Sequence, residues 1–235
     1  MKKIIPYVLM VSAAFGTMSL QAQTADEIVS KHIDALGGKD VIKKVNSIYM
    51  EGSTQVMGNE SPTTETILNG KGYKNESDFN GQKMVQCVND KGGWTTNPMA
   101  GGGAQAMPDE AYNSARGQLN VGGALYDYTA KGSTVTLLGK DGSAYKLKLV
   151  TADKDETTYY IDGSTYYISK LVKKGNVMGQ DVEITIAYTD YKKTDIGYVI
   201  PFTRNIDLGQ FQVSTTFTKA EINKPVDPAI FNMPK

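Results

Sequence analysis

The chain has 235 residues, with 25 basic and 25 acidic side chains, one histidine and one cysteine, so its formal net charge is zero. A protein that binds nucleic acid needs a clustered excess of Lys and Arg, and this balance predicts no nucleic-acid partner. Because Cys87 is the only cysteine, an internal disulfide is excluded. The length fits one all-β domain or two small ones, and we expect one because no linker-like stretch divides the chain.

The first segment has the layout of a secretory signal peptide. Lys2 and Lys3 form a basic start, an apolar segment follows from Ile4 to Leu20, and cleavage is expected near Ala22 or Gln23. The alternative is an uncleaved membrane anchor, for which the apolar segment is short and interrupted by Pro and Gly. We therefore predict a signal peptide over 1–23 and one mature domain over 24–235, exported to the periplasm.

The mature chain begins with a predicted amphipathic helix. Thr24 and Glu27 have the spacing of a capping box, apolar residues then recur at helical intervals, and Gly37-Gly38 ends the helix. His32 lies on this helix among apolar neighbours, so we expect a packed histidine in preference to a catalytic base. This helix needs a sheet to cover its apolar side.

A second helix is predicted in the middle of the chain, from Pro108 towards Leu119. The uncharged, glycine-rich stretch 97–107 precedes it. That stretch is either a slack surface connection or a mobile lid that carries Met99 and Met107 over the mouth of a pocket.

Most of the remaining chain reads as short antiparallel strands. Apolar and polar residues alternate over 145–149, 182–186 and 210–217, and pairs such as Asp162-Gly163 and Gly175-Asn176 favour hairpin turns. About 11–12 strands are expected, with a second meander that begins near residues 124–126, which is consistent with one large curled sheet. The predicted fold class is mainly β, with the N-terminal and mid-chain helices on the concave face of the sheet.

No residue pattern typical of a catalytic or metal centre is present in the sequence. The zinc motif His-Glu-x-x-His, the nucleophile motif Gly-x-Ser-x-Gly and the phosphate-binding glycine loop are all missing. We therefore expect no enzyme activity, no metal and no cofactor. An exported hydrolase with a carboxylate pair stays open as an alternative, although no pair is singled out.

The inward side chains of the strands point to a different kind of site. Either the two helices fill the concavity completely, or an apolar cavity is left for an acyl chain or another lipid-like molecule. The candidate residues for such a cavity and its lid are Trp94, Met99, Met107, Leu147, Leu149, Ile161, Ile184, Ile186, Phe211, Val213 and Phe217.

Several stretches resemble the LolA/LolB-like superfamily of lipoprotein carriers, especially its lipoprotein-sorting-protein-like branch in Bacteroidetes. The matching stretches are 25–28 through 35–38, 159–162 with Lys170, 188–191, 197–201, and 222–227 with Phe231 and Pro234. The resemblance implies an open half-barrel with helices as a lid over its concave face. It also implies a carrier that shelters acyl chains without a cofactor. Arg116 and Arg204 are the only arginines, and neither lies in a motif of the known carriers.

Two functional hypotheses follow. The first is a monomeric periplasmic binding protein whose partner is a lipid or an acylated lipoprotein. The second is an envelope protein-interaction or sensor module that uses the same fold to bind a protein and holds no ligand. An open apolar concavity favours the first hypothesis, and a filled one favours the second.

Overall fold

The computed structural model describes residues 23–79, 81–97, 101–177 and 179–234. The helices are α1 (Ala25–Ala35), α2 (Lys39–Ile42) and α3 (Asp109–Ala115), with the 3₁₀ helices η2 (Arg116–Leu119) and η3 (Pro228–Phe231). The strands are β1 (Ser47–Val56), β2 (Asn59–Leu68), β3 (Gly72–Phe79), β4 (Gln82–Asn89), β5 (Gly93–Thr96), β6 (Ala104–Ala106), β7 (Thr134–Asp141), β8 (Ala144–Val150), β9 (Glu156–Ile161), β10 (Ile168–Val177), β11 (Gln180–Lys193), β12 (Val199–Asp207) and β13 (Gln212–Ile222).

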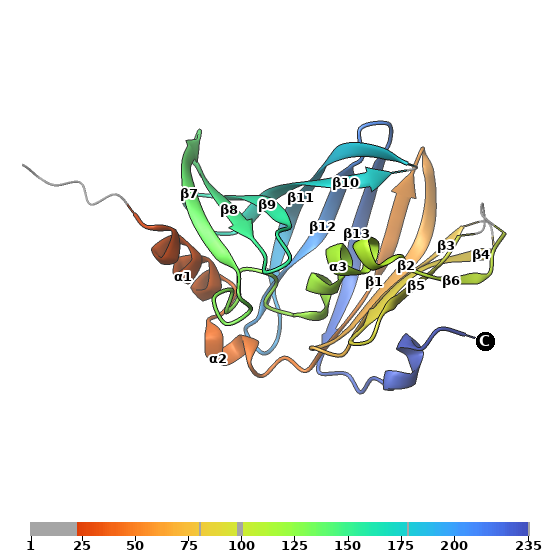
Figure 1. The fold of residues 1–235 in the computed structure, drawn as a ribbon. Coiled ribbons are helices and arrows are strands. Elements are labelled where there is room, and N and C mark those ends of the chain that lie inside the picture. The colour runs from red at the N-terminus through yellow and green to blue at the C-terminus, as the bar shows by residue number, and fades with distance from the viewer. Residues whose placement is uncertain (1–22, 80, 98–100, 178, 235) are drawn as a thin grey trace, which may run out of the picture.

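All strands belong to one 13-stranded sheet in the order β6-β5-β4-β3-β2-β1-β13-β12-β11-β10-β9-β8-β7. Two meanders, β1–β6 and β7–β13, are joined where the first strand pairs antiparallel with the last. The edges are therefore β6 and β7, which are consecutive in the chain. The segment between them has to cross the whole sheet, and α3 lies on that crossing, inside the curve of the sheet (Figure 1).

The sheet curls strongly but does not close. Register shifts occur between Glu51 and Gly52, between Leu137 and Gly139, and between Ile168 and Lys170. Such bulges bend a strand and increase its twist. Gly52 is required at its bulge because an added Cβ would lie 2.0 Å from the carbonyl oxygen of Thr216.

The main core lies where α1 and α2 cover the concave face. The capping box of α1 is present, since Thr24 Oγ1 accepts from the Glu27 amide (3.2 Å) and Glu27 Oε2 accepts from the Thr24 amide (3.0 Å). Ile28 on α1 is 0% exposed, as are Leu147 on β8 and Ile161 on β9, and all three belong to one apolar cluster. The predicted N-terminal helix is confirmed with its cap.

The mid-chain helix covers a second part of the concave face. Ala115 and Leu119, at the ends of α3 and η2, pack against Tyr73 and Val88. On the other side of the curve, Lys173 Nζ on β10 donates to Ser114 Oγ (3.1 Å). This helix therefore bridges the two arms of the half-barrel.

The C-terminal segment covers the opposite, outer face of β3–β5. Phe231 in η3 is 2% exposed, and its carbonyl oxygen accepts from Trp94 Nε1 (3.0 Å), Asn89 Nδ2 (3.1 Å) and Cys87 Sγ (3.4 Å). Its ring lies so close to Gly72 that a Cβ there would sit 2.4 Å from the ring. The outer face thus has a small core of its own.

The fold class predicted from the sequence is confirmed, with three local differences. The sheet has 13 strands where about 11–12 were expected. Gly175-Asn176 lies within β10 and not in a turn, since Asn176 pairs with Asp181 on β11. Residues 124–126, where the second meander was expected to begin, are in turns that precede β7. The signal-peptide residues 1–22 lie outside the described part of the chain.

Candidate functional site

The concave face carries two neighbouring cross-strand rows of different chemistry. Cα pairing places Leu171, Ile186, Ile206, Val213 and Val56 side by side across β10, β11, β12, β13 and β1. We call these five half-buried residues the apolar row. A second row lies beside the first, two positions away on β11, β12, β13 and β1, and consists of Tyr188, Arg204, Thr215 and Thr54. Ser61 on β2 pairs with Thr54 and continues this row. We call these five residues the polar row.

Most of the predicted ligand-binding residues lie on this concave face. Cross-strand partners have side chains on the same face of the sheet. Leu147 pairs with Tyr159, Tyr159 pairs with Leu171, and Phe217 pairs with Gly52. The seven residues on this face are Leu147, Leu149, Ile161, Ile184, Ile186, Val213 and Phe217.

These seven residues divide by burial into two groups. Leu147, Leu149, Ile161 and Phe217 are at most 4% exposed and belong to the core under α1. Ile184, Ile186 and Val213 are only half-buried. The part of the face that retains accessible apolar surface is therefore the part away from α1 and α2.

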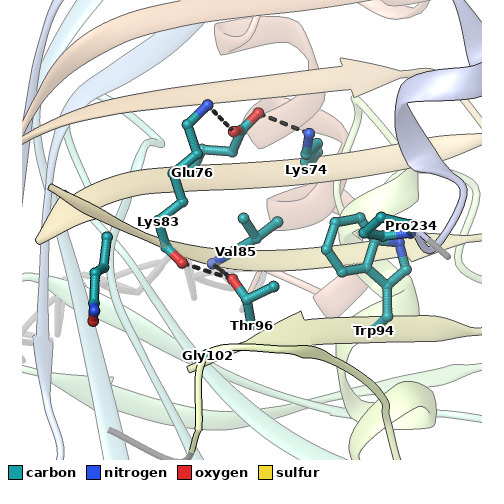
Figure 2. A pocket seen from close by; sticks show the side chains of 9 residues that line it. Lys74, Glu76, Lys83, Val85, Trp94, Thr96, Gly102 and Pro234 are labelled. Carbon is teal, nitrogen blue, oxygen red and sulfur yellow. Dashed lines mark hydrogen bonds and ion pairs between the residues drawn. The ribbon is translucent and has the colours of Figure 1, made fainter. Parts of the chain in front are cut away.

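Trp94 differs from the expectation, because it lies on the outer face. It pairs with Cys87 on β4, and it packs with Val85 and Phe231. Figure 2 shows it at the rim of a surface hollow of about 480 Å³, beside Lys74 and Glu76. An ion pair joins Lys74 Nζ to Glu76 Oε2 (2.8 Å) there.

The other three predicted residues fall in different places. Phe211 lies in the turn between β12 and β13 and lines a second hollow of about 420 Å³ with Met57 and Gln212. Met107 packs against the cluster that α3 forms with Tyr73 and Val88, so it lies at the edge of the concave face. Met99 is outside the described residues.

A buried ion pair in the concave face was not predicted from the sequence. Arg204 Nη2 on β12 donates to Glu65 Oε2 on β2 (2.8 Å), and Tyr73 Oη donates to the same oxygen (3.0 Å). The side chains of Arg204 and Glu65 are 20% and 8% exposed. The guanidinium lies over the ring of Phe217, 5.9 Å from its centroid. Two strands, β13 and β1, lie between the partners, so the pair ties the curve together.

The electrostatics of this cluster follow from burial and from the charge of Glu65. Burial alone would lower the pKa of Arg204, but the neighbouring Glu65 carboxylate outweighs it and raises that pKa. Burial, with the charge of Glu65, also raises the pKa of Tyr73. Burial raises the pKa of Tyr188 as well. Both phenols therefore stay protonated at neutral pH and can act as hydrogen-bond donors.

A chain of hydroxyl groups extends the polar row. Thr54 Oγ1 lies 2.9 Å from Thr215 Oγ1, and Thr63 Oγ1 donates to Thr54 Oγ1 (2.8 Å). Thr63 Oγ1 is also 2.8 Å from Ser77 Oγ. These hydroxyls satisfy one another across β13, β1, β2 and β3, so the floor of the half-barrel is polar beside the apolar row.

The single histidine and the single cysteine are packed residues in the described structure. His32 is 2% exposed and its Nδ1 lies 2.8 Å from the Tyr166 carbonyl oxygen, and burial lowers its pKa. Cys87 is 0% exposed, and burial raises the pKa of its thiol to about 12. The predicted burial of Cys87 is confirmed, and His32 is packed as expected.

No cluster of three or more His, Cys, Asp or Glu side chains among the described residues is suited to hold a metal ion. None of the helices in the described part of the chain has the length and apolar character needed to span a membrane.

Solved structures of other proteins have a similar fold. No family model and no curated protein matches the sequence. A structure named as an outer membrane lipoprotein-sorting protein domain from Vibrio parahaemolyticus is 14% identical, with a TM-score of 0.58, over 88% of this chain and 97% of that one. A LolA superfamily protein from Nitrosomonas europaea is 12% identical, with a TM-score of 0.57, over 90% and 98%. This chain has the fold of lipoprotein-sorting and LolA superfamily structures.

Proposed function

We propose that this protein is an exported, periplasmic binding protein that holds the acyl chain of a lipid or a lipoprotein on its concave face. The observation that carries the proposal is the apolar row. Its five aliphatic side chains form a continuous strip across five strands, yet each stays half-buried. Contiguous apolar surface that the fold covers only in part favours a ligand that can cover the rest.

The chemistry of the face suits binding without catalysis. Leu, Ile and Val offer an acyl chain only dispersion contacts and release of water, each of them non-directional. The polar row lies next to them but presents no arrangement of nucleophile and base among the described residues. Holding and releasing an acyl chain fits these properties better than a hydrolytic reaction does.

The position of α3 supports a role as a cover for the bound chain. It bridges the arms through packing of Leu119 on Tyr73 and Val88, and through the exposed ion pair between Arg116 and Asp153. Exposed ion pairs of this kind contribute only about 0–1 kcal/mol. The end of the helix near Asp153 is therefore held more weakly than the end packed on Tyr73 and Val88, and it would open first when a chain enters or leaves.

Strand β10 offers a matched pair of variants to test the proposal. Leu171 belongs to the apolar row, whereas the adjacent Val172 points to the outer face, and both are half-buried. In a titration of delipidated protein with a fluorescent long-chain acyl probe, we expect Leu171→Ser to weaken binding about tenfold. That factor corresponds to the loss of about 1.5 kcal/mol of apolar contact.

Val172→Ser is the control and should bind the probe like the unmodified protein. Equal affinity of the two variants would contradict a site on the apolar row. Absence of probe binding to the unmodified protein would contradict the proposed function as a whole.

A further inference from the structure

The ion pair between Arg204 and Glu65 is neutral as a whole but leaves hydrogen-bond donors unused. Within the described part of the chain, Arg204 Nε is buried and has no hydrogen-bond partner. The guanidinium donates through Nη2 to Glu65 and lies over the face of Phe217. A guanidinium carries five N–H groups, and a buried donor without an acceptor destabilises the fold.

Tyr188 provides another donor at the same place. Its Cα pairs with that of Arg204 in the polar row, and burial raises the pKa of its hydroxyl, with smaller opposing effects from the charges of Arg204 and Glu65. Its hydroxyl makes no hydrogen bond to any described residue. Arg204 and Tyr188 are thus neighbouring donors beside Glu65 Oε2, which already accepts two hydrogen bonds, from Tyr73 and Arg204.

The apolar row starts next to these donors. Ile206 and Ile186 are each two residues from Arg204 and Tyr188 on the same strands, and a separation of two residues along a strand is about 6.6 Å. An acyl chain that covers the apolar row would bring the polar group at its end within reach of Arg204. This polar group has to accept hydrogen bonds beside the ion pair of Arg204 and Glu65.

Charge selects among the possible groups. A free carboxylate would add a negative charge beside Glu65, in surroundings where Arg204 is already neutralised, and an unmatched buried charge is strongly disfavoured. An ester carbonyl is an acceptor without charge, and it would take up the donors of Arg204 and Tyr188 without disturbing the ion pair. The apolar part of the same molecule would lie on the apolar row.

We propose that Arg204 and Tyr188 form a binding site for the ester carbonyl of an esterified acyl chain, so that the protein distinguishes acyl esters from free fatty acids. This inference rests on the proposed acyl-binding function and names the chemical class of its ligand. Glu65 is a positioning residue that holds the guanidinium and keeps the site neutral.

The test compares two probes that differ only in the carbonyl group. Monopalmitoylglycerol carries the ester, and hexadecyl glyceryl ether has the same chain length and head group without it. With delipidated protein at pH 8, we expect the ester to bind about tenfold more tightly than the ether, the size of one hydrogen bond from a charged donor. A ratio near one would overturn the proposal.

The double variant Glu65→Gln/Arg204→Met removes the charged donor while keeping the site neutral and the apolar stem over Phe217. It should bind the ether like the unmodified protein, and its preference for the ester should fall to the part that the Tyr188 hydroxyl supplies. Because the ester and the ether are compared on the same variant, a loss of stability affects both affinities and leaves their ratio unchanged. An undiminished preference in this variant would overturn the assignment to Arg204.

The single variant Glu65→Gln tests the role of charge. It leaves the guanidinium with an unmatched positive charge, so palmitate should gain at least about tenfold in affinity relative to monopalmitoylglycerol. An unchanged ratio would contradict charge selection at this site. If the unmodified protein binds none of the three probes, the proposed acyl-binding function itself fails, whereas equal binding of all three overturns only the carbonyl site.

Discussion

The two ends of the concave face are built from the same kinds of residue but differ in burial. Under α1, Leu147, Leu149 and Ile161 are 0–1% exposed and form a closed core. At the far ends of β10–β13, Ile184, Ile186 and Val213 have the same alternation in their strands and stay half-buried. Helices α1 and α2 cover the first end and not the second. The covered end therefore stabilises the fold, and the other end is available to a ligand.

The largest effect is expected from a truncation at the covered end. Leu147→Ala would leave a cavity in the core under α1 and should lower the free energy of unfolding by about 2–5 kcal/mol. Urea unfolding measures this loss. Acyl-probe affinity of the folded variant should be unchanged, because Leu147 is beneath the helix. A large loss of affinity without a loss of stability would contradict the division of the face.

A smaller effect is expected where α3 meets the sheet. Met107 packs against Tyr73, Val88, Ala115 and Leu119, so Met107→Ser should loosen the cover. We expect the acyl probe to dissociate several-fold faster, with a stability loss of about 1 kcal/mol. Stopped-flow release measures the first quantity. Unchanged release kinetics would show that this segment does not retain the ligand.

His32 gives the covered end a pH dependence. Burial lowers its pKa, so the unfolded chain takes up a proton on acidification below about pH 6.5 while the folded chain does not. The free energy of unfolding should therefore fall as the pH decreases from 6.5, by at most about 1.4 kcal/mol per pH unit from this residue. Urea unfolding of the protein and of His32→Gln between pH 7.5 and 5 should show the smaller slope in the variant. Equal slopes would contradict this prediction.

The smallest expected effect concerns the reactivity of the Cys87 thiol on the outer face. Its thiol is buried beneath Phe231, and its pKa is raised to about 12 by burial, so the native protein should react with a thiol reagent at pH 8 far more slowly than the urea-unfolded protein. Phe231→Ala is the matched comparison, because removing that ring should expose the thiol and speed labelling. Fast labelling of the unmodified native protein would contradict the outer-face core.

Local signals in the sequence were sufficient for the elements and the fold class. The capping box at Thr24 and Glu27 predicted α1, and strict alternation over 145–149 predicted both β8 and the shared face of Leu147 and Leu149. Such signals act over a few residues. They require no knowledge of which strand lies next to which.

The missed features depend on pairing between distant segments. Alternation along a strand does not say which face of the sheet Trp94 occupies, and the decision comes from Phe231, 137 residues away from it. Arg204 and Glu65 are 139 residues apart. A signal for them was nevertheless present, because Arg204 alternates with Phe202 and Ile206 as an inward charge in an otherwise apolar series. Glycine in β10 misled the turn prediction because Gly175 is followed by two more paired residues.

Native mass spectrometry of the mature protein, purified from the periplasm without detergent and then extracted with organic solvent, tests the central claim most directly. We expect a mass above that of the bare chain, and we expect the extract to contain an esterified acyl lipid or an acylated peptide. A bare protein that stays bare after incubation with such lipids and peptides would contradict acyl binding. That result would favour an envelope protein-interaction module with this fold.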